Sequence, residues 1–302
     1  MTTQAIEYGI APAGHRLPGG TRIGAVRLQV SDLARSLAYY QDVLGLRVLA
    51  RSEGAATLGA HGGDAALVEL REKRGARAVP LRGKLGLYHF ALLLPDREAL
   101  GRFVAHLAEI GERAGASDHL VSEALYLRDP DGLGIEVYAD RLREGWRHVE
   151  RELVMDTRPL DLNDLVRAAG GRPWTGAPAG TTVGHVHLHV GGIEEARAFY
   201  HGALGLDAVV WSYPGALFLS AGGYHHHLGL NTWAGPGAEP AGPDDARLLE
   251  WELVVPTAAD AEAAARSLEA AGHAVRREER GWLAADPWGT PLRVVGAEAG
   301  VP

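Results

Sequence analysis

The sequence predicts an α+β fold built from four repeated units, each with a strand, a helix and further short strands. The main observation is a pair of near-copies, RIGAVRLQVSDLARSLAYYQDVLGL at 22–46 and TVGHVHLHVGGIEEARAFYHGALGL at 182–206, which align without a gap at an offset of 160 residues. A second pair of segments repeats at an offset of 161 residues, which matches Pro95 with Pro256. Internal repeats of this kind indicate an architecture assembled from similar supersecondary units.

Each near-copy is expected to open with a strand and to continue into a helix. Apolar side chains alternate with polar or small ones along IGAVRLQV and VGHVHLHV, a period of two that is typical of a strand with one apolar face. Helical spacing of apolar residues then runs through LARSLAYYQDVLG and IEEARAFYHGALG, which end at Gly45 and Gly205. Short strands follow at AALVELRE in the first copy and at ALFLSAGG and HHHLGLNTW in the second.

The second and fourth units share their own order of elements. The segments LGLYHFALLLP, REALGRFVAHLAEIG and EALYLRDPDGLGIEVYAD correspond to RLLEWELVVP, ADAEAAARSLEAAG and GWLAADPWGTPLRVVG. The four units therefore span residues 21–75, 84–140, 181–235 and 247–297. We expect an N-terminal domain over 1–140, a linker over 141–180 with a short helix at LNDLVRAA, and a C-terminal domain over 181–302.

Composition excludes several classes of function. A net charge of −8 over 302 residues argues against non-specific binding of nucleic acid, which needs a basic surface. The absence of cysteine excludes disulfides, zinc–thiolate sites and iron–sulfur clusters. No apolar run approaches the roughly 20 residues that span a membrane, and the N-terminus lacks the pattern of a signal peptide. The cytoplasm is the expected location, with no membrane partner, and the sequence leaves open whether the chain forms a homodimer.

Three positions that could carry metal ligands differ between the paired units. Alignment of the units gives the pairs His185 and Ala25, His89 and Glu250, and Glu136 and Arg293. The set His185, His89 and Glu136 is chemically complete, because two imidazoles and one carboxylate form the facial triad of non-haem Fe(II) enzymes, with three coordination positions open. Arginine cannot bind a cation, so in the other set we expect no metal and a salt bridge between Glu250 and Arg293.

The four-unit chain resembles the vicinal oxygen chelate superfamily, and most closely its catechol 2,3-dioxygenase-type extradiol dioxygenases. The resemblance covers nearly the whole chain and rests on GHVHLHV, AGGYHHHLGLNTW, GLYHFALLLP, GASDHLVSEALYLRDPDGLGIEVYADR and MDTRPLDL. It implies βαβββ units that pair into half-open barrels around a metal. It also implies that His185, His89 and Glu136 are the ligands of Fe(II), with Mn(II) as the alternative ion.

The same resemblance implies the catalytic residues. The active-site tyrosine of the family, ten residues before the glutamate ligand, falls on Tyr126. Its acid–base histidine falls in the run at 225–227, at His226 or His227. Alternation along the following strand would instead favour His225 and His227, so the register of this run is open.

One feature departs from the family pattern. The well-known two-domain extradiol enzymes take all three ligands from their last two units, and here those units supply only His185. Units one and two supply His89 and Glu136 but have Ala25 at the remaining position. Units two and three together give the full set, so the resemblance implies a site built across the expected domain boundary or between two chains.

The leading hypothesis is an Fe(II)-dependent extradiol ring-cleaving dioxygenase that acts on a catechol-like aromatic diol with O2. A cleft histidine would remove a proton from the diol and later return it, and Tyr126 would hydrogen-bond a substrate oxygen. One alternative is a glyoxalase-like lyase or isomerase of the same superfamily, although Gly229 stands roughly where its extra carboxylate ligand would lie. The other is a metal-free protein that binds an aromatic or drug-like molecule.

Overall fold

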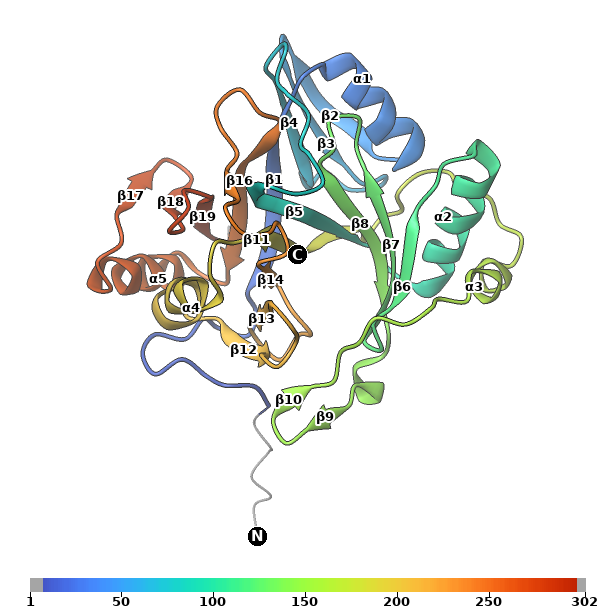
Figure 1. Ribbon diagram of the computed structural model, residues 1–302. Helices are drawn as coiled ribbons and strands as arrows, with labels where there is room; N and C mark the ends of the chain where they lie inside the picture. Colours follow the sequence, from blue (N-terminus) through green and yellow to red (C-terminus); the bar gives the residue numbers. More distant parts are fainter. Residues whose placement is uncertain (1–7, 298–302) are drawn as a thin grey trace.

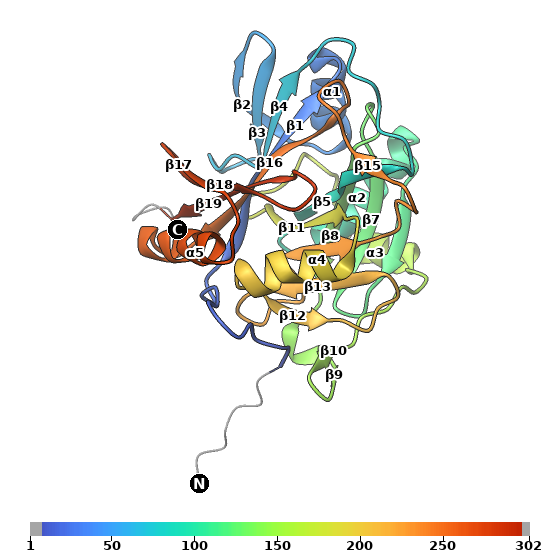
Figure 2. The ribbon, with the colours of Figure 1, turned by 60° about the vertical axis from the view of Figure 1, so that its left-hand side comes forward.

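The computed structural model describes residues 8–297, and its architecture is a pair of large β-sheets with helices packed around them (Figure 1). Within these residues the strands form a nine-stranded sheet, an eight-stranded sheet and a two-stranded ribbon. Figure 2 shows the same sheets from the side of α4 and α5. Strand–helix–strand units recur along the chain, which confirms the predicted α+β class.

The nine-stranded sheet contains the second and third predicted units. Its strands, in spatial order, are β12 (Asp207–Val210), β13 (Ala216–Ser220), β14 (Leu228–Asn231), β11 (Thr182–His189), β5 (Lys84–Leu93), β8 (Gly134–Asp140), β7 (Ser122–Arg128) and β6 (Gly115–Asp118), with β15 (Glu239–Pro240) beside β5. The antiparallel pairing of β5 with β11 joins the two units at the centre.

The eight-stranded sheet contains the first and fourth units. Its strands, in spatial order, are β17 (Val275–Glu278), β18 (Gly281–Ala285), β19 (Pro291–Gly296), β16 (Arg247–Val255), β1 (Arg22–Val30), β4 (Val68–Glu72), β3 (Ala55–Gly59) and β2 (Arg47–Ser52). The antiparallel pairing of β1 with β16 is the central contact here and corresponds to that of β5 with β11.

Each sheet takes one unit from each side of the segment 141–180, so the sheets do not follow a division into 1–140 and 181–302. Units from the two sides pair because the first strand of each unit has one edge without a partner inside its own unit. Pairing across the chain satisfies the hydrogen-bonding groups of that edge. The segment 141–180 carries a 3₁₀ turn (Arg143–Gly145), the ribbon of β9 (His148–Val149) and β10 (Glu152–Leu153), and α3 (Leu162–Ala168), the helix expected at LNDLVRAA.

The helices follow their sequence signals with one difference. The remaining α-helices are α1 (Leu33–Ala38), α2 (Arg97–Ile110), α4 (Ile193–Arg197) and α5 (Ala258–Ala270). The single helix expected in each near-copy becomes a short α-helix that continues as a π-helix, over Tyr39–Val43 after α1 and over Ala198–Ala203 after α4. Asp96 caps α2 by accepting the backbone N–H of Ala99 at 2.6 Å. No helix within residues 8–297 is long and apolar enough to span a membrane.

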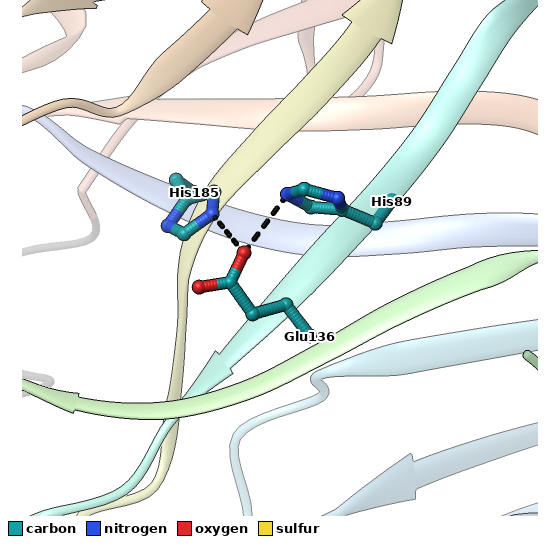
Figure 3. A group of neighbouring side chains, drawn as sticks. All are labelled: His89, Glu136 and His185. Carbon is teal, nitrogen blue, oxygen red and sulfur yellow. Dashed lines mark hydrogen bonds and ion pairs between the residues drawn. The ribbon is translucent and has the colours of Figure 1, made fainter. Parts of the chain in front are cut away.

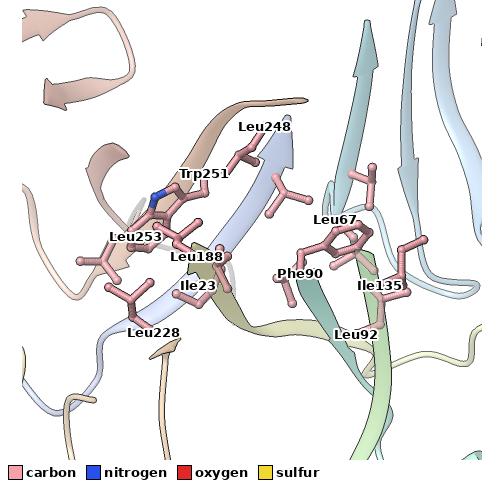
Figure 4. Packing of buried hydrophobic residues seen from close by; sticks show 14 of the residues in the cluster. Ile23, Leu67, Phe90, Leu92, Ile135, Leu188, Leu228, Leu248, Trp251 and Leu253 are labelled. Atoms are coloured by element: carbon pink, nitrogen blue, oxygen red, sulfur yellow. The ribbon is translucent and has the colours of Figure 1, made fainter. Parts of the chain in front are cut away.

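One hydrophobic cluster joins the two sheets (Figure 4). Phe90 and Leu188 of the nine-stranded sheet belong to it together with Trp251 and Ile23 of the eight-stranded sheet, and each is at most 3% exposed. Burial of such side chains stabilises a fold by roughly 1.5–3 kcal/mol each. The shared core fixes the positions of the two sheets relative to each other.

A repeated tyrosine–aspartate contact connects consecutive units. The hydroxyl group of Tyr40 donates to the carboxylate of Asp129 at 3.2 Å, and Tyr200 donates to Asp286 at 3.1 Å. Asp129 also accepts the backbone N–H groups of the turn that follows it, at 2.9 Å. Asp129 and Asp286 therefore have structural roles, and each links the helix of one unit to the last strands of the next.

We predict that Asp129→Asn reduces the pH dependence of stability. Burial raises the pKa of the Asp129 carboxyl from 3.8 to about 6, so between these values the folded chain holds a proton that the unfolded chain has lost. The contribution of Asp129 to the free energy of unfolding should then fall by about 3 kcal/mol as the pH rises through this window. Urea denaturation at several pH values tests this, and the same slope in both proteins would contradict it.

Candidate metal centre

Three buried side chains from neighbouring strands meet in the nine-stranded sheet (Figure 3). His185 comes from β11, His89 from β5 and Glu136 from β8, which are consecutive in the sheet. Glu136 Oε2 lies 3.1 Å from His185 Nε2 and 3.0 Å from His89 Nε2. Their ligand atoms all lie within 4.8 Å of one another, and each residue is at most 5% exposed. The structure thus brings together, within one chain, the three residues selected by aligning the units.

The strand register explains this convergence. Ala91 of β5 pairs with His185 on one side and with Glu136 on the other. His89 lies two residues before Ala91 on the same strand, so the two side chains share one face of the sheet. The methyl side chain of Ala91 leaves the space between the flanking strands free, and the imidazoles and the carboxylate fill it.

The electrostatics of Glu136 and His89 favour the protonation states that bind a metal. Burial opposes ionisation of Glu136, but His185 and His89 outweigh it and hold the pKa of this carboxyl well below its usual range. Burial lowers the pKa of His89, which favours the neutral imidazole. His89 Nε2 is buried and makes no hydrogen bond of acceptable geometry, although Glu136 Oε2 is near. An ionised carboxylate together with two imidazoles fits a divalent ion, and the nitrogen-rich set suits a transition metal better than Mg²⁺ or Ca²⁺.

A cavity of about 240 Å³ is lined by His89 and Glu136. The rest of its wall is largely aromatic, with a few polar side chains: Tyr88, Ser117, His119, Tyr126, Met155, Asp156, Thr157, His187, Tyr213, Phe218, His226 and Trp233. Among these lining residues none is a lysine or an arginine. Aromatic walls with a few convergent polar groups suit a flat ring that carries hydroxyl groups.

Tyr126 faces this cavity from β7, where it pairs with Glu136 of β8. Burial, together with the nearby Glu136 carboxylate, raises the pKa of the phenol well above its usual range, so the hydroxyl keeps its proton. His119 Nε2 lies 2.5 Å from the Tyr126 hydroxyl oxygen, and His119 Nδ1 lies 2.8 Å from the carbonyl oxygen of Asp156. A carbonyl only accepts, so Nδ1 carries the proton of His119 and Tyr126 donates to its Nε2.

Alignment of the units did not select His119, although it lines the cavity. It follows β6 directly, and Leu120 beside it has a left-handed backbone with φ of 70°. The sequence signal is a histidine seven residues before Tyr126 in DHLVSEALY, across a tight β6–β7 hairpin. His119, in the turn before β7, therefore lines the same cavity as Tyr126 of β7.

The histidine run at 225–227 contributes one side chain to the cavity. His226 lines it, and the ring centre of His226 lies 4.1 Å from that of His185. His227 is not among the lining residues: its Nδ1 accepts the backbone N–H of Ala221 at 3.2 Å, and burial lowers its pKa to about 3. Of the two histidines predicted as the acid–base residue, His226 is the one whose position suits that role.

Strand alternation favoured His225 and His227 as the residues that face the cavity, and this expectation is wrong. The strand β14 begins only at Leu228, so the histidines precede it in a turn. Side chains of a turn follow no period of two, and the extrapolation of the strand pattern back to His226 therefore fails.

Two further histidines of β11 are held by an amide. Asn231 Nδ2 donates to His187 Nε2 at 2.9 Å, and His189 Nδ1 donates to Asn231 Oδ1 at 2.6 Å. His187 lines the cavity, and a Cβ on Gly229 would lie 2.7 Å from its ring. A larger residue at Gly229 would therefore displace His187, so the geometry leaves no room for a fourth protein ligand there.

The corresponding place in the eight-stranded sheet holds an ion-pair network. Arg293 Nε and Nη2 donate to the two carboxylate oxygens of Glu250, both at 2.7 Å, which confirms the predicted salt bridge. Arg27 donates to Glu250 at 3.2 Å, and Arg293 also donates to Glu278 at 2.8 Å. The hydrogen bond to Glu250 raises the pKa of Arg293, which keeps its charge. Within residues 8–297, the group of His89, Glu136 and His185 is the only one arranged to hold a metal.

The sequence matches the family model described as the Glyoxalase/Bleomycin resistance protein/Dioxygenase superfamily over residues 22–137 and 182–289. A catechol-2,3-dioxygenase of Bacillus subtilis is 44% identical over 270 residues, which cover 88% of this chain and 94% of that protein. A lactoylglutathione lyase of Neisseria meningitidis is 32% identical over 117 residues, which cover 36% of this chain and 83% of that protein.

Solved structures share the fold. A putative dioxygenase from Bacillus subtilis superposes with a TM-score of 0.63 at 14% identity, over 95% of this chain and 87% of that one. Glyoxalase I from Zea mays superposes with a TM-score of 0.54 at 19% identity, over 92% of each chain. At these identities the likeness concerns the fold alone.

We predict that Arg293→Met destabilises the chain by about 3–5 kcal/mol, because it leaves the buried Glu250 carboxylate with Arg27 as its remaining cationic partner. The matched double variant, Arg293→Met with Glu250→Leu, removes both charges and should recover most of this loss. Chemical denaturation measures both effects. A double variant that is as unstable as the single one would contradict the view that the network stabilises this sheet through charge compensation.

Proposed function

Because the chain belongs to the Glyoxalase/Bleomycin resistance protein/Dioxygenase superfamily, we propose that it is an Fe(II)-dependent extradiol dioxygenase that cleaves a catechol-like aromatic diol with O2. The observation that carries the proposal is the convergence of His89, Glu136 and His185 beside an aromatic cavity, in a chain that matches a catechol-2,3-dioxygenase over most of its length. The metal and the roles of individual residues are inferred from the chemistry of this arrangement.

His89, His185 and Glu136 are the proposed ligands of the ion. When bound, Fe(II) supplies open coordination positions for the diol and the redox coupling between the diol and O2. Two imidazoles and one carboxylate favour iron, and Mn(II) is the alternative ion. The three ligands come from adjacent strands of one sheet, so their positions depend on backbone pairing rather than on flexible loops.

His226 is the proposed acid–base residue. Its ring lines the cavity and uses Nδ1 for the hydrogen bond with His225, so a diol hydroxyl can donate to Nε2 there. Burial lowers the pKa of His226 well below its usual value, which keeps the ring neutral and able to accept a proton. The imidazolium formed in this way can return the proton to a later oxyanion of the substrate.

Tyr126 and the aromatic wall are proposed to orient the substrate. The Tyr126 hydroxyl stays protonated, and it can donate its one proton to a substrate oxygen that replaces His119 Nε2, 2.5 Å away, as the acceptor. Phe218, Tyr213 and Trp233 provide apolar surface for the ring and exclude water from the diol side. The lining residues offer no arginine or lysine for a ring carboxylate, so a neutral catechol is the favoured substrate.

The site favours the dioxygenase proposal over both alternative hypotheses. A glyoxalase-like reaction would call for a further protein ligand, and Gly229 sits against His187 where a larger side chain does not fit. The lyase relative covers only 36% of this chain. A metal-free binding protein would have no need of a complete ligand set, and that set is buried and intact.

Oxygen uptake with catechol after anaerobic Fe(II) loading tests the proposed activity. We expect uptake that requires both catechol and Fe(II), with both atoms of labelled O2 found in a ring-opened product by mass spectrometry. A chelator should abolish uptake, and Fe(II) should restore it where Zn(II) does not. Fe(II)-loaded protein that binds catechol without consuming O2 would contradict the proposal.

We predict that His89→Ala abolishes iron retention, whereas Tyr126→Phe keeps iron and slows turnover by roughly 5- to 150-fold. The first change removes a bond to the metal, and the second removes a substrate hydrogen bond worth ~1–3 kcal/mol. Metal analysis after gel filtration, with steady-state kinetics, measures both effects. His187→Gln is the matched control for iron, since His187 is a buried histidine of the same cavity outside the triad. Equal loss of iron from all three variants would refute the assigned roles.

A further inference from the structure

A chain of hydrogen bonds runs from the protein surface to the cavity through two consecutive histidines. Asp140 Oδ1 lies 2.9 Å from His225 Nε2, and His225 Nδ1 lies 2.7 Å from His226 Nδ1. The Asp140 side chain is 28% exposed, whereas His225 is fully buried and His226 is 5% exposed. The catalytic role proposed for His226 uses neither Asp140 nor His225, so these two residues have no assigned part in the reaction.

The donors and acceptors along this chain have one consistent assignment when both rings are neutral. A carboxylate only accepts, so His225 must carry its proton on Nε2 to donate to Asp140. A neutral imidazole then has a lone pair on its other nitrogen, and His225 Nδ1 must accept from His226 Nδ1. His226 therefore carries its proton on Nδ1, and its Nε2 is left with a free lone pair at the cavity.

The surroundings hold the first two members in place. Asp140 Oδ1 also accepts from the hydroxyl of Tyr224 at 3.2 Å, and Tyr224 in turn lies 2.7 Å from the hydroxyl of Tyr138. The ring of His225 is packed between aromatic neighbours, with its centre 4.1 Å from Tyr224 and 5.4 Å from Trp146. A ring held in this way keeps Nε2 directed at Asp140 and Nδ1 directed at His226.

The strand β8 connects this arrangement to the metal centre. Glu136, Tyr138 and Asp140 alternate along β8 and so share one face of the sheet. One strand thus supplies both the carboxylate of the triad and the carboxylate that holds His225. Any shift of β8 would move the two carboxylates together.

We propose that Asp140 and His225 are positioning residues that hold His226 in the tautomer whose unprotonated Nε2 faces the diol. The proposal rests on the function assigned above to His226. It goes beyond that function, because it explains why this ring presents a base, rather than an N–H group, to the substrate. The logic is that of a buried carboxylate that fixes the tautomer of a catalytic imidazole, extended here by one further histidine.

The direct test is the tautomer of His226, read by two-bond ¹H–¹⁵N correlation spectra of the full chain with labelled histidine and diamagnetic Zn(II) in place of iron. We expect His226 with its proton on Nδ1 and His225 with its proton on Nε2. In Asp140→Ala and in His225→Phe, His226 should become a mixture of tautomers. Two results would overturn the proposal. One is that His226 carries its proton on Nε2 in the unaltered protein, and the other is that His226 has the same tautomer in the unaltered protein and in both variants.

Kinetics of the Fe(II)-loaded enzyme supply a second readout. Both variants should lower kcat for catechol by about tenfold, because the fraction of His226 that can act as a base falls, while KM changes by less than about threefold. Asp164→Ala is the matched control: it removes a half-exposed carboxylate paired with Arg97, and both kcat and the His226 tautomer should be unchanged. A loss of kcat in the control equal to that in Asp140→Ala would also overturn the proposal.

Two variants are used so that misfolding of one does not decide the result. Asp140→Ala removes the carboxylate at the surface end of the hydrogen-bond chain, and His225→Phe replaces the buried middle residue with a ring of similar size. Failure of the proposed function gives a different result from failure of this inference. Without dioxygenase activity in the unaltered chain, the spectra still report the His226 tautomer. With full activity and an unchanged tautomer in both variants, the function stands and the positioning role is wrong.

Discussion

The antiparallel pairing of β5 with β11 is the contact on which the candidate site depends. These strands belong to units that lie on opposite sides of the segment 141–180, and neither unit alone holds three ligands. The register matters as much as the pairing, because it sets His185 opposite Ala91 while Glu136 takes the other side. A shift by one residue would turn His185 to the opposite face of the sheet and dismantle the triad.

Much of this arrangement could be predicted from the sequence. The gapless repeat and the strand periodicity predicted four units and their class, since both depend on local patterns that survive in any tertiary context. Comparison of equivalent positions selected His89, Glu136 and His185, because a ligand set is recognisable by its chemistry. The ligand set indicated that units two and three meet, but the sequence could not decide whether they meet within one chain or between two, since the edge strands of all four units are similar and the choice depends on packing across the whole chain.

Sequence reasoning was least specific for residues in turns: it did not select His119, and it left open which histidine of the run at 225–227 faces the cavity. His119 stands in a tight hairpin, and the run at 225–227 precedes β14 in a turn, where no periodicity tells which ring faces the cavity. For the same reason the contact of His225 with Asp140, 85 residues apart in sequence, has no local signal. Alignment of units finds what the copies share or have lost. It cannot find groups that belong to one unit alone, such as these turn histidines.

The two central pairings show how a duplicated sheet can lose a site and keep its fold. A buried glutamate lies in or beside each pairing, Glu250 on β16 and Glu136 on β8 next to β5, and a buried carboxylate is costly unless its neighbours compensate it. On β5 and β11 the neighbours of Glu136 are two imidazoles, which can bind a metal together with the carboxylate. At β1 and β16, Arg293 and Arg27 compensate Glu250 permanently and leave it no capacity to bind a cation. The same structural requirement is thus met in two ways, and only the one that uses imidazoles permits chemistry.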